Sequence, residues 1–215
     1  RFGFRLQSTG DRSGNMDLLL NLRRPNLFDS ASYAEADFTI GRSYGAAGRL
    51  RLANQPWQGL FFQPELYYRS DLHDVYVDNQ IRAQFTLDRA GLMLDAGQEL
   101  GTWGELRLGM LLEHGRVGPR IATIALDSVD ATVGGPRLAW RLDTLDRKPY
   151  PTRGFTSEFL ALRSLRSLGS ETDFLRLGWG GSLVMDLGGG HYLEPNWDLA
   201  SALDTGPPLT QAVFL

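Results

Sequence analysis

The feature that most constrains this chain is an alternation of apolar and polar residues with a period of two. Between Phe174 and Leu187 the odd positions are Leu175, Leu177, Trp179, Gly181, Leu183, Met185 and Leu187, and the even positions include Arg176, Gly178, Gly180, Ser182 and Asp186. Successive side chains of a β-strand point to opposite faces, so this segment has one apolar and one polar face. Its length matches the roughly 10-residue strands that cross a bilayer in a β-barrel.

The same pattern recurs along the chain. It is found at Arg1–Thr9, Met16–Arg23, Tyr33–Gly41, Tyr44–Leu52, Gly59–Arg69, Arg89–Gly97, Glu105–Glu113 and Arg137–Asp143. With a strand that starts at Gly154 and another over Gly190–Ala202, the pattern predicts about eleven antiparallel strands. No stretch approaches the roughly 18 consecutive apolar residues of a membrane helix.

Two kinds of all-β protein fit such strands. A soluble sandwich also has one apolar and one polar face in each sheet, and it stays open as an alternative. A transmembrane antiparallel β-barrel is favoured because the strands have similar lengths, because glycines and charges of both signs share the polar face, and because aromatic residues lie near strand ends. The aromatic residues expected at the membrane interface are Tyr44, Trp57, Tyr68, Trp103 and Tyr192.

The connections alternate in character. Polar connections of variable length are expected at Gly10–Asn15, Leu72–Asn79, Val117–Ser128 and Leu165–Thr172, and tight ones at Gln98–Gly104, Leu145–Thr152 and Gly188–Gly190. Short periplasmic turns and longer external loops are typical of outer-membrane barrels. An odd, unclosed set of strands leaves bare edges that lipid does not tolerate. We therefore expect either further strands beyond Leu215 or pairing with another copy of the chain.

The composition narrows the possible functions. A net charge of −3 provides no electrostatic footprint for nucleic acid. The chain has no cysteine, which excludes a disulfide framework and a thiolate metal site. We expect no cofactor and no metal.

Three short motifs that resemble catalytic signatures have simpler explanations. Gly41-Arg42-Ser43-Tyr44-Gly45 fits the G-x-S-x-G elbow of serine hydrolases, but that elbow leads from a strand into a helix, and here two strands flank it. Asp204-Thr205-Gly206 offers one carboxylate where an aspartic protease needs two. Gly188-Gly189-Gly190 is followed by neither a helix nor a phosphate-binding lysine, and a tight hairpin is expected there. We expect no catalytic residue, with an esterase that uses Ser43 as an alternative.

A more specific pattern is Asp143-Thr144-Leu145-Asp146-Arg147-Lys148-Pro149-Tyr150-Pro151-Thr152-Arg153-Gly154. Prolines pre-set a turn, Gly154 permits re-entry into a strand, and the two aspartates can accept hydrogen bonds from exposed amides. This D-x-x-D…P-x-P-T-x-G pattern resembles the periplasmic hairpin of the superfamily that contains the barrel assembly protein BamA and the two-partner secretion transporters. The resemblance makes Asp143, Asp146, Pro149, Pro151 and Gly154 the expected periplasmic turn motif.

Two other segments resemble one branch of that superfamily, the type Vd (patatin-like) autotransporters. Gly101-Thr102-Trp103-Gly104-Glu105-Leu106-Arg107-Leu108-Gly109 is similar to a strand start of these proteins, and Gln211–Leu215 resembles the lead-in to their long loop that folds back into the lumen. The resemblance implies a sixteen-stranded barrel whose last strands lie beyond Leu215. It also implies a POTRA domain and a patatin-like lipase passenger before Arg1, so that any lipase chemistry belongs to the passenger.

These observations lead to one expected function and two alternatives. We expect 1–215 to be a single outer-membrane barrel domain that secretes or displays a fused passenger. The alternatives are a two-partner-secretion or assembly transporter for another substrate, and a soluble β-sandwich binding module or esterase. The expected partners are membrane lipid and lipopolysaccharide, a translocated polypeptide, the barrel assembly machinery and a second copy of the chain. The inward phase of the strands predicts the lumen-facing residues Arg49, Arg51, Glu65, Glu105, Arg107, Arg141, Glu158 and Arg176.

Overall fold

The computed structural model describes residues 4–9, 15–28, 31–53, 59–77, 80–122, 127–146 and 151–204. Two short 3-10 helices, η1 (Gly101–Trp103) and η2 (Arg166–Leu168), lie between strands. The strands are β1 (Phe4–Thr9), β2 (Asn15–Pro25), β3 (Tyr33–Ile40), β4 (Tyr44–Ala53), β5 (Leu60–Val77), β6 (Gln80–Glu99), β7 (Glu105–Ala122), β8 (Val129–Asp143), β9 (Gly154–Ser164), β10 (Phe174–Gly188), β11 (His191–Leu193) and β12 (Asn196–Asp204).

Within the described residues all strands belong to one sheet, and each pairs antiparallel with the next from β1 to β10. β11 and β12 both pair with β10, at successive parts of the same edge. Pro195 separates them because proline has no backbone N–H to donate, although its carbonyl still accepts a hydrogen bond from Leu183 N at 3.1 Å. β11 and β12 therefore share one position in the sheet, and the described part of the chain has the eleven strand positions that the alternation predicts.

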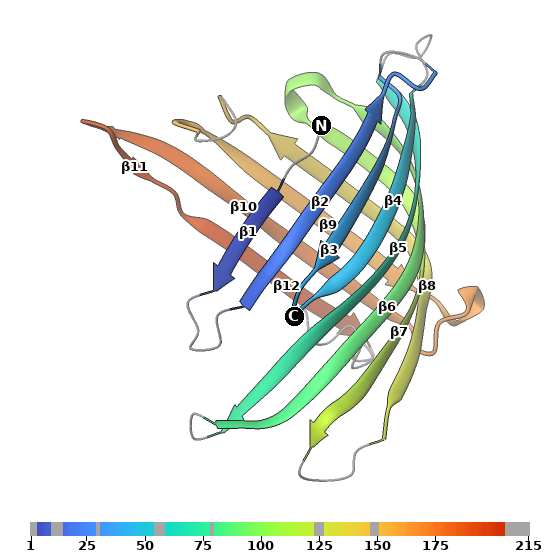
Figure 1. Ribbon diagram of the computed structural model, residues 1–215. Helices are drawn as coiled ribbons and strands as arrows, with labels where there is room; N and C mark the ends of the chain where they lie inside the picture. Colours follow the sequence, from blue (N-terminus) through green and yellow to red (C-terminus); the bar gives the residue numbers. More distant parts are fainter. Residues whose placement is uncertain are drawn as a thin grey trace.

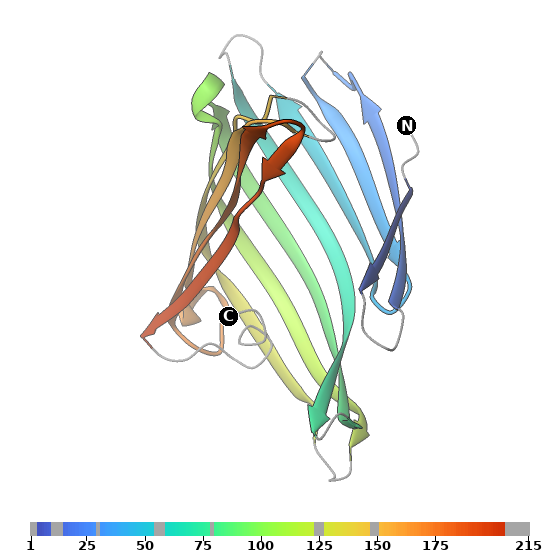
Figure 2. The same cartoon turned by 90° about the vertical axis from the view of Figure 1, so that its left-hand side faces the viewer.

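The sheet curves into a barrel wall, with β1 and β12 at its two edges (Figures 1 and 2). The C-terminal ends of β2, β4, β6, β8 and β10 lie at one end of the sheet, which we call the turn end, and those of β1, β3, β5, β7 and β9 lie at the opposite end. No helix in the described part of the chain is long and apolar enough to cross a membrane. The predicted fold class, an all-β antiparallel barrel, is confirmed.

One predicted loop is in fact largely strand, and another is strand in its first half. β5 continues to Val77 and β6 begins at Gln80, so most of Leu72–Asn79 is paired, and β7 runs on to Ala122 through the first half of Val117–Ser128. β6 is accordingly much longer than the predicted Arg89–Gly97. The polarity of these segments suggested loops, but strands that project past an apolar band have no need of apolar side chains. Figure 1 shows the ends of β5–β8 projecting beyond their neighbours.

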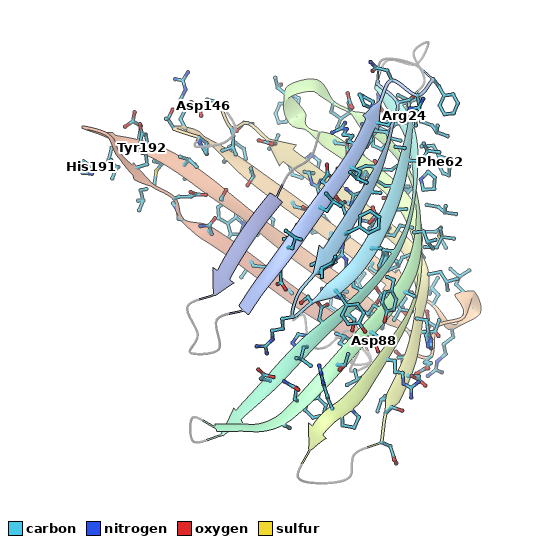
Figure 3. All side chains as sticks on the ribbon, in the orientation of Figure 1. Arg24, Phe62, Asp88, Asp146, His191 and Tyr192 are labelled. Carbon is cyan, nitrogen blue, oxygen red and sulfur yellow. The ribbon has the colours of Figure 1, made fainter. Side chains whose placement is uncertain are left out.

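The outer, convex face of the sheet carries an apolar band. In β5–β8 this band is bounded by two cross-strand rows, one through Leu60, Gln98, Leu106 and Trp140, and one through Tyr68, Ala90, His114 and Thr132. Between the rows, Leu66 and Leu108 are 65% and 64% exposed. Figure 3 shows Phe62 on this convex side. Soluble proteins rarely expose a contiguous apolar surface of this kind.

Aromatic rings on the opposite, inner face cover glycines of the neighbouring strand. Phe61 is directly across from Gly97 and Tyr67 is across from Gly91. A Cβ atom at Gly97 would lie 2.3 Å from Phe61 Cζ, and one at Gly91 would lie 2.4 Å from Tyr67 Cζ. Any larger residue at these two positions would push the ring away, so glycine is required there.

Candidate functional site

The candidate site is the inner face of the sheet, where the charged side chains gather. Arg49, Arg51, Glu65, Glu105, Arg107, Arg141, Glu158 and Arg176 all lie on it, because each falls in the strand phase opposite to the apolar band. The structure brings seven of the eight into ion pairs with other inner-face residues. Their role as a lumen wall stays a prediction.

One cluster is centred on Arg49 of β4. Its guanidinium lies 3.4 Å from Glu35, 3.1 Å from Asp37 and 3.2 Å from Glu65, and thus joins β3, β4 and β5. Asn21 of β2 donates hydrogen bonds to both β3 carboxylates, each at 2.5 Å. Four neighbouring strands are therefore tied together on the inner face.

A second cluster runs from β4 to β8 near the turn end. Arg51 pairs with Glu99 at 2.5 Å and Glu105 at 2.8 Å. Glu105 also pairs with Arg107. Asp95, whose side chain is only 3% exposed, lies 2.8 Å from Arg137 and 3.9 Å from Arg107.

The pair Arg141–Glu158 links β8 to β9 and is much more open to solvent. Two carboxylate oxygens of Glu158 accept hydrogen bonds from Arg141, both at 3.0 Å, and more than half of each side chain is exposed. Arg176 of β10 lies on the same face, in the row of Leu162. Arg141, Glu158 and Arg176 line an open cavity of about 660 Å³ over β9, β10 and β12.

Arginines also stack on the inner aromatic rings. The guanidinium carbon of Arg51 is 3.5 Å from the centroid of Phe61, and that of Arg69 is 5.5 Å from the centroid of Tyr67. The Tyr67 hydroxyl donates a hydrogen bond to Glu113 of β7. Each ring is thus held between a glycine and a cation, an arrangement favoured by the ring quadrupole.

The sequence prediction missed several members of this network. Asp95, Arg137, Glu113, Tyr67 and Asn21 share the inward phase with the predicted residues. The phase alone could have found all five. Their choice of partners could not be predicted, since it depends on a cross-strand register that alternation does not fix.

The predicted turn motif connects β8 and β9. Asp146 accepts hydrogen bonds from Thr152 N at 2.9 Å, from Thr152 Oγ1 at 2.6 Å and from Arg153 N at 3.3 Å. Asp143 Oδ1 accepts one from Leu145 N at 3.2 Å. Gly154 has a φ of +112°, a conformation that side chains disfavour. Pro149 lies outside the described residues, and Pro151 begins the described segment after the turn.

The aromatic residues expected at the interface lie near both ends of the band. Tyr44 and Tyr68 have ring centroids 6.1 Å apart at the end opposite to the turns. At the turn end, Trp140 Nε1 donates a hydrogen bond to the carbonyl of Trp103 at 2.9 Å. Tyr192 is half exposed on β11 (Figure 3), and Trp57 lies outside the described residues.

The motifs that suggested catalysis do not assemble a catalytic site in the described residues. Gly41–Ser43 forms the bend between β3 and β4, with no helix after Ser43, and Ser43 N donates to Asp17 at 3.2 Å. Gly188, Gly189 and Gly190 all have positive φ in a hairpin. Asp204 ends β12 and pairs with Arg163, and the rest of its triplet lies outside the described residues. No group of metal-ligating side chains was found in the described ranges.

Comparison with known proteins identifies the fold. No protein-family model matches the sequence, and no curated protein matches it. Among solved structures, the chain is similar to BamA from Haemophilus ducreyi lacking POTRA domains 1-3, with a TM-score of 0.69 and 12% sequence identity. The match covers 96% of this chain and 47% of that one, so the chain spans about half the length of its structural neighbour. The described residues thus have the fold of part of a BamA-like barrel.

Proposed function

We propose that this chain forms part of the wall of an outer-membrane β-barrel of the BamA/two-partner-secretion superfamily. Its inner face then lines a path for a polypeptide. The barrel is most like the translocator of a type Vd autotransporter, which secretes or displays a fused patatin-like passenger. The chain itself has no enzymatic role in this proposal.

The observation that carries the proposal is the division of the sheet into two faces. The convex face has an apolar band that is nine residues wide in each of β5–β8, from Leu60 to Tyr68 in β5. A strand that crosses the membrane in a barrel needs about 9–11 residues. The concave face carries ion-paired charges of both signs beside a small apolar cluster of Val133, Leu162 and Phe174, and the charges suit a water-filled lumen.

The partners follow from the two faces. The convex face contacts membrane lipid, and lipopolysaccharide at the end where Tyr44 and Tyr68 lie. The turn end faces the periplasm, where the barrel assembly machinery acts on barrels of this class. A translocated polypeptide contacts the concave face. A second copy of the chain is a further candidate partner at the sheet edges.

The test uses the full-length protein, expressed in a Gram-negative host with an epitope tag at its N-terminus. Proteinase K added to intact cells should remove the tag, while the barrel stays in the outer-membrane fraction and migrates faster in gels before boiling than after. A barrel that is folded in the outer membrane and leaves the tag protected from the protease would contradict the autotransporter assignment.

The same experiment distinguishes the autotransporter from the second candidate function, a transporter for a separate substrate. The likeness to BamA also favours a transporter that assembles or secretes a separate substrate. In that case the tag stays protected, and depletion of the protein removes another protein from the surface. A chain that stays in the soluble fraction without detergent would contradict both the autotransporter and the transporter for a separate substrate. It would favour the soluble β-sandwich or esterase.

A further inference from the structure

The connection between β9 and β10, residues 165–173, folds outward over the convex face of β8. Gly134 lies in the outward phase of β8, directly across from Leu112 of the apolar band. A Cβ atom at Gly134 would lie 2.4 Å from the carbonyl oxygen of Leu168 and 3.4 Å from Leu112 Cδ1. The backbone at the end of η2 therefore lies against the convex side of β8, beside the band. In Figure 1 this orange connection stands out from the wall next to β8.

Hydrogen bonds fix the connection to β8. The hydroxyl of Ser170, a buried residue, donates to Gly134 O at 2.8 Å and accepts from Gly134 N at 2.6 Å. Leu165 N donates to Gly134 O at 2.9 Å, and Glu171 N donates to Thr132 O at 3.2 Å. Thr132 and Gly134 belong to the last two rows of the band at the end opposite to the turns. The exposed residues of the connection are thus held at the edge of the band.

The exposed side chains of η2 include one apolar and one basic group. Leu168 is 40% exposed, and Arg166 is exposed as well. Arg166 Nε donates to the carbonyl of Glu171 at 3.1 Å, and the two terminal nitrogens of Arg166 have no acceptor among the described residues. By contrast, Arg116 on β7, just past the band, pairs with Asp130 at 3.6 Å. Arg166 therefore offers donors and a positive charge to an anion outside the described chain.

A leucine and an arginine exposed together at the edge of an apolar band suit the boundary between acyl chains and headgroups. An arginine side chain lays its apolar stem along apolar surface and keeps its charged end at the polar side. Interfacial membrane anchors combine apolar side chains with basic ones in the same way. The guanidinium also matches phosphate in geometry, because it donates two parallel hydrogen bonds.

We propose that the β9–β10 connection is a membrane-interface anchor, in which Leu168 enters the acyl layer and Arg166 binds a phosphate of a lipid headgroup. This inference rests on the proposed function, since it takes the convex face to lie in lipid. With the turn end in the periplasm, the anchor lies in the external leaflet, and its lipid is lipopolysaccharide. The inference deepens the proposed function by assigning the lipopolysaccharide contact to two named side chains.

The depth of the connection is measured with a nitroxide at Ser167→Cys, because the chain has no native cysteine. The full-length protein, with any cysteine outside 1–215 changed to serine, is placed in phosphatidylcholine vesicles. Reference labels at Leu108→Cys, within the band, and at Asp130→Cys, past it, report lipid and water. The ratio of relaxation by oxygen to relaxation by a water-soluble nickel chelate should lie between the two references. A ratio equal to that at position 130 would overturn the anchor.

The phosphate contact is tested by titration of the purified full-length protein in detergent with lipopolysaccharide and, separately, with phosphatidylglycerol. Arg166→Gln should weaken lipopolysaccharide binding about tenfold, the effect expected when one charge-assisted hydrogen bond is lost. Arg116→Gln is the matched control and should bind as the parent does. Unchanged binding by Arg166→Gln, or an equal loss in both variants, would overturn the phosphate contact. An equal loss for phosphatidylglycerol would overturn the assignment to lipopolysaccharide.

These measurements separate the anchor from the proposed function. If the label at position 108 reports lipid and the label at position 167 reports water, the anchor alone is lost. If the label at position 108 itself reports water, the membrane barrel is lost and the anchor with it. Neither measurement depends on secretion, so a protein that leaves its N-terminal tag protected can still retain the anchor while it loses the autotransporter assignment.

Discussion

The guanidinium of Arg51 stacks on the ring of Phe61, with 3.5 Å between its central carbon and the ring centroid, and the same guanidinium pairs with Glu99 and Glu105. Phe61 in turn covers Gly97. A glycine of β6, a ring of β5 and a cation of β4 thus form one layered contact across three strands. The carboxylates of Glu99 and Glu105, at the turn end, hold the guanidinium of Arg51 in this contact.

Gly97→Ala should destabilise the barrel by about 1–3 kcal/mol, the usual cost of an extra methyl group in a packed site. Its Cβ would lie 2.3 Å from Phe61 Cζ, so the ring and the arginine above it must shift. The midpoint of urea unfolding in micelles, followed by tryptophan fluorescence, measures the loss. Gly48→Ala is the matched control. If Phe61→Leu fails to relieve the loss in the double variant, the clash is not its cause.

Asp95→Ala should cost about 3–5 kcal/mol, the range observed when one member of a buried ion pair is removed. Asp95 is almost fully buried, and its loss leaves Arg137 and Arg107 without this carboxylate. Glu158→Gln is the comparison, since Arg141–Glu158 is more than half exposed and such pairs contribute up to about 1 kcal/mol. Equal losses in the two variants would show that burial does not govern the inner network.

Asp146→Ala should slow barrel folding and lower stability by about 1–2 kcal/mol, because three exposed hydrogen bonds to Thr152 and Arg153 are lost. The fraction with folded gel mobility, sampled over time after dilution from urea, measures both effects. Asp146→Asn keeps an acceptor for the two backbone amides and should fall between the variant and the parent. A folding rate unchanged by Asp146→Ala would show that this turn does not guide barrel folding.

Met110→Arg should cost about 2–4 kcal/mol, and Leu187→Arg about 0–1 kcal/mol, because the cost of a lipid-facing arginine depends on its depth. Met110 lies midway along the β7 band, and Leu187 lies next to the β10–β11 turn. Unfolding in phospholipid vesicles measures both changes. Similar small costs at the two positions would mean that the convex face does not meet lipid.

Much of the fold could be predicted from the sequence because alternation reports a purely local property, the face to which each side chain points. The phase placed Arg49, Glu65 and Arg107 on one face, which is the concave face of the sheet, and their role in a lumen stays a prediction. It failed where that property stops being informative. The segment from Leu72 to Val77 lies past the apolar band, where polar residues are tolerated on both faces, and its polarity predicts a loop although it pairs with β6.

The ion-pair partners are the part that the sequence could not provide. Arg51 and Glu105 are 54 residues apart, and they meet only because the strands between them are in one particular register. Register depends on bulges such as that between Gln84 and Phe85, where β6 and β7 shift by one residue.

The central claim, that the two faces of this sheet meet lipid and water respectively, is tested most directly by spin labels on a chain that has no native cysteine. Single nitroxides at Leu66→Cys and Leu108→Cys, on the convex face, and at Glu65→Cys and Arg107→Cys, on the concave face, are measured in the full-length protein in lipid vesicles. Oxygen, which dissolves in lipid, should relax the first pair more strongly, and a water-soluble nickel chelate should relax the second pair. Equal relaxation of both pairs by the nickel chelate would contradict the account, because both faces would then be in water.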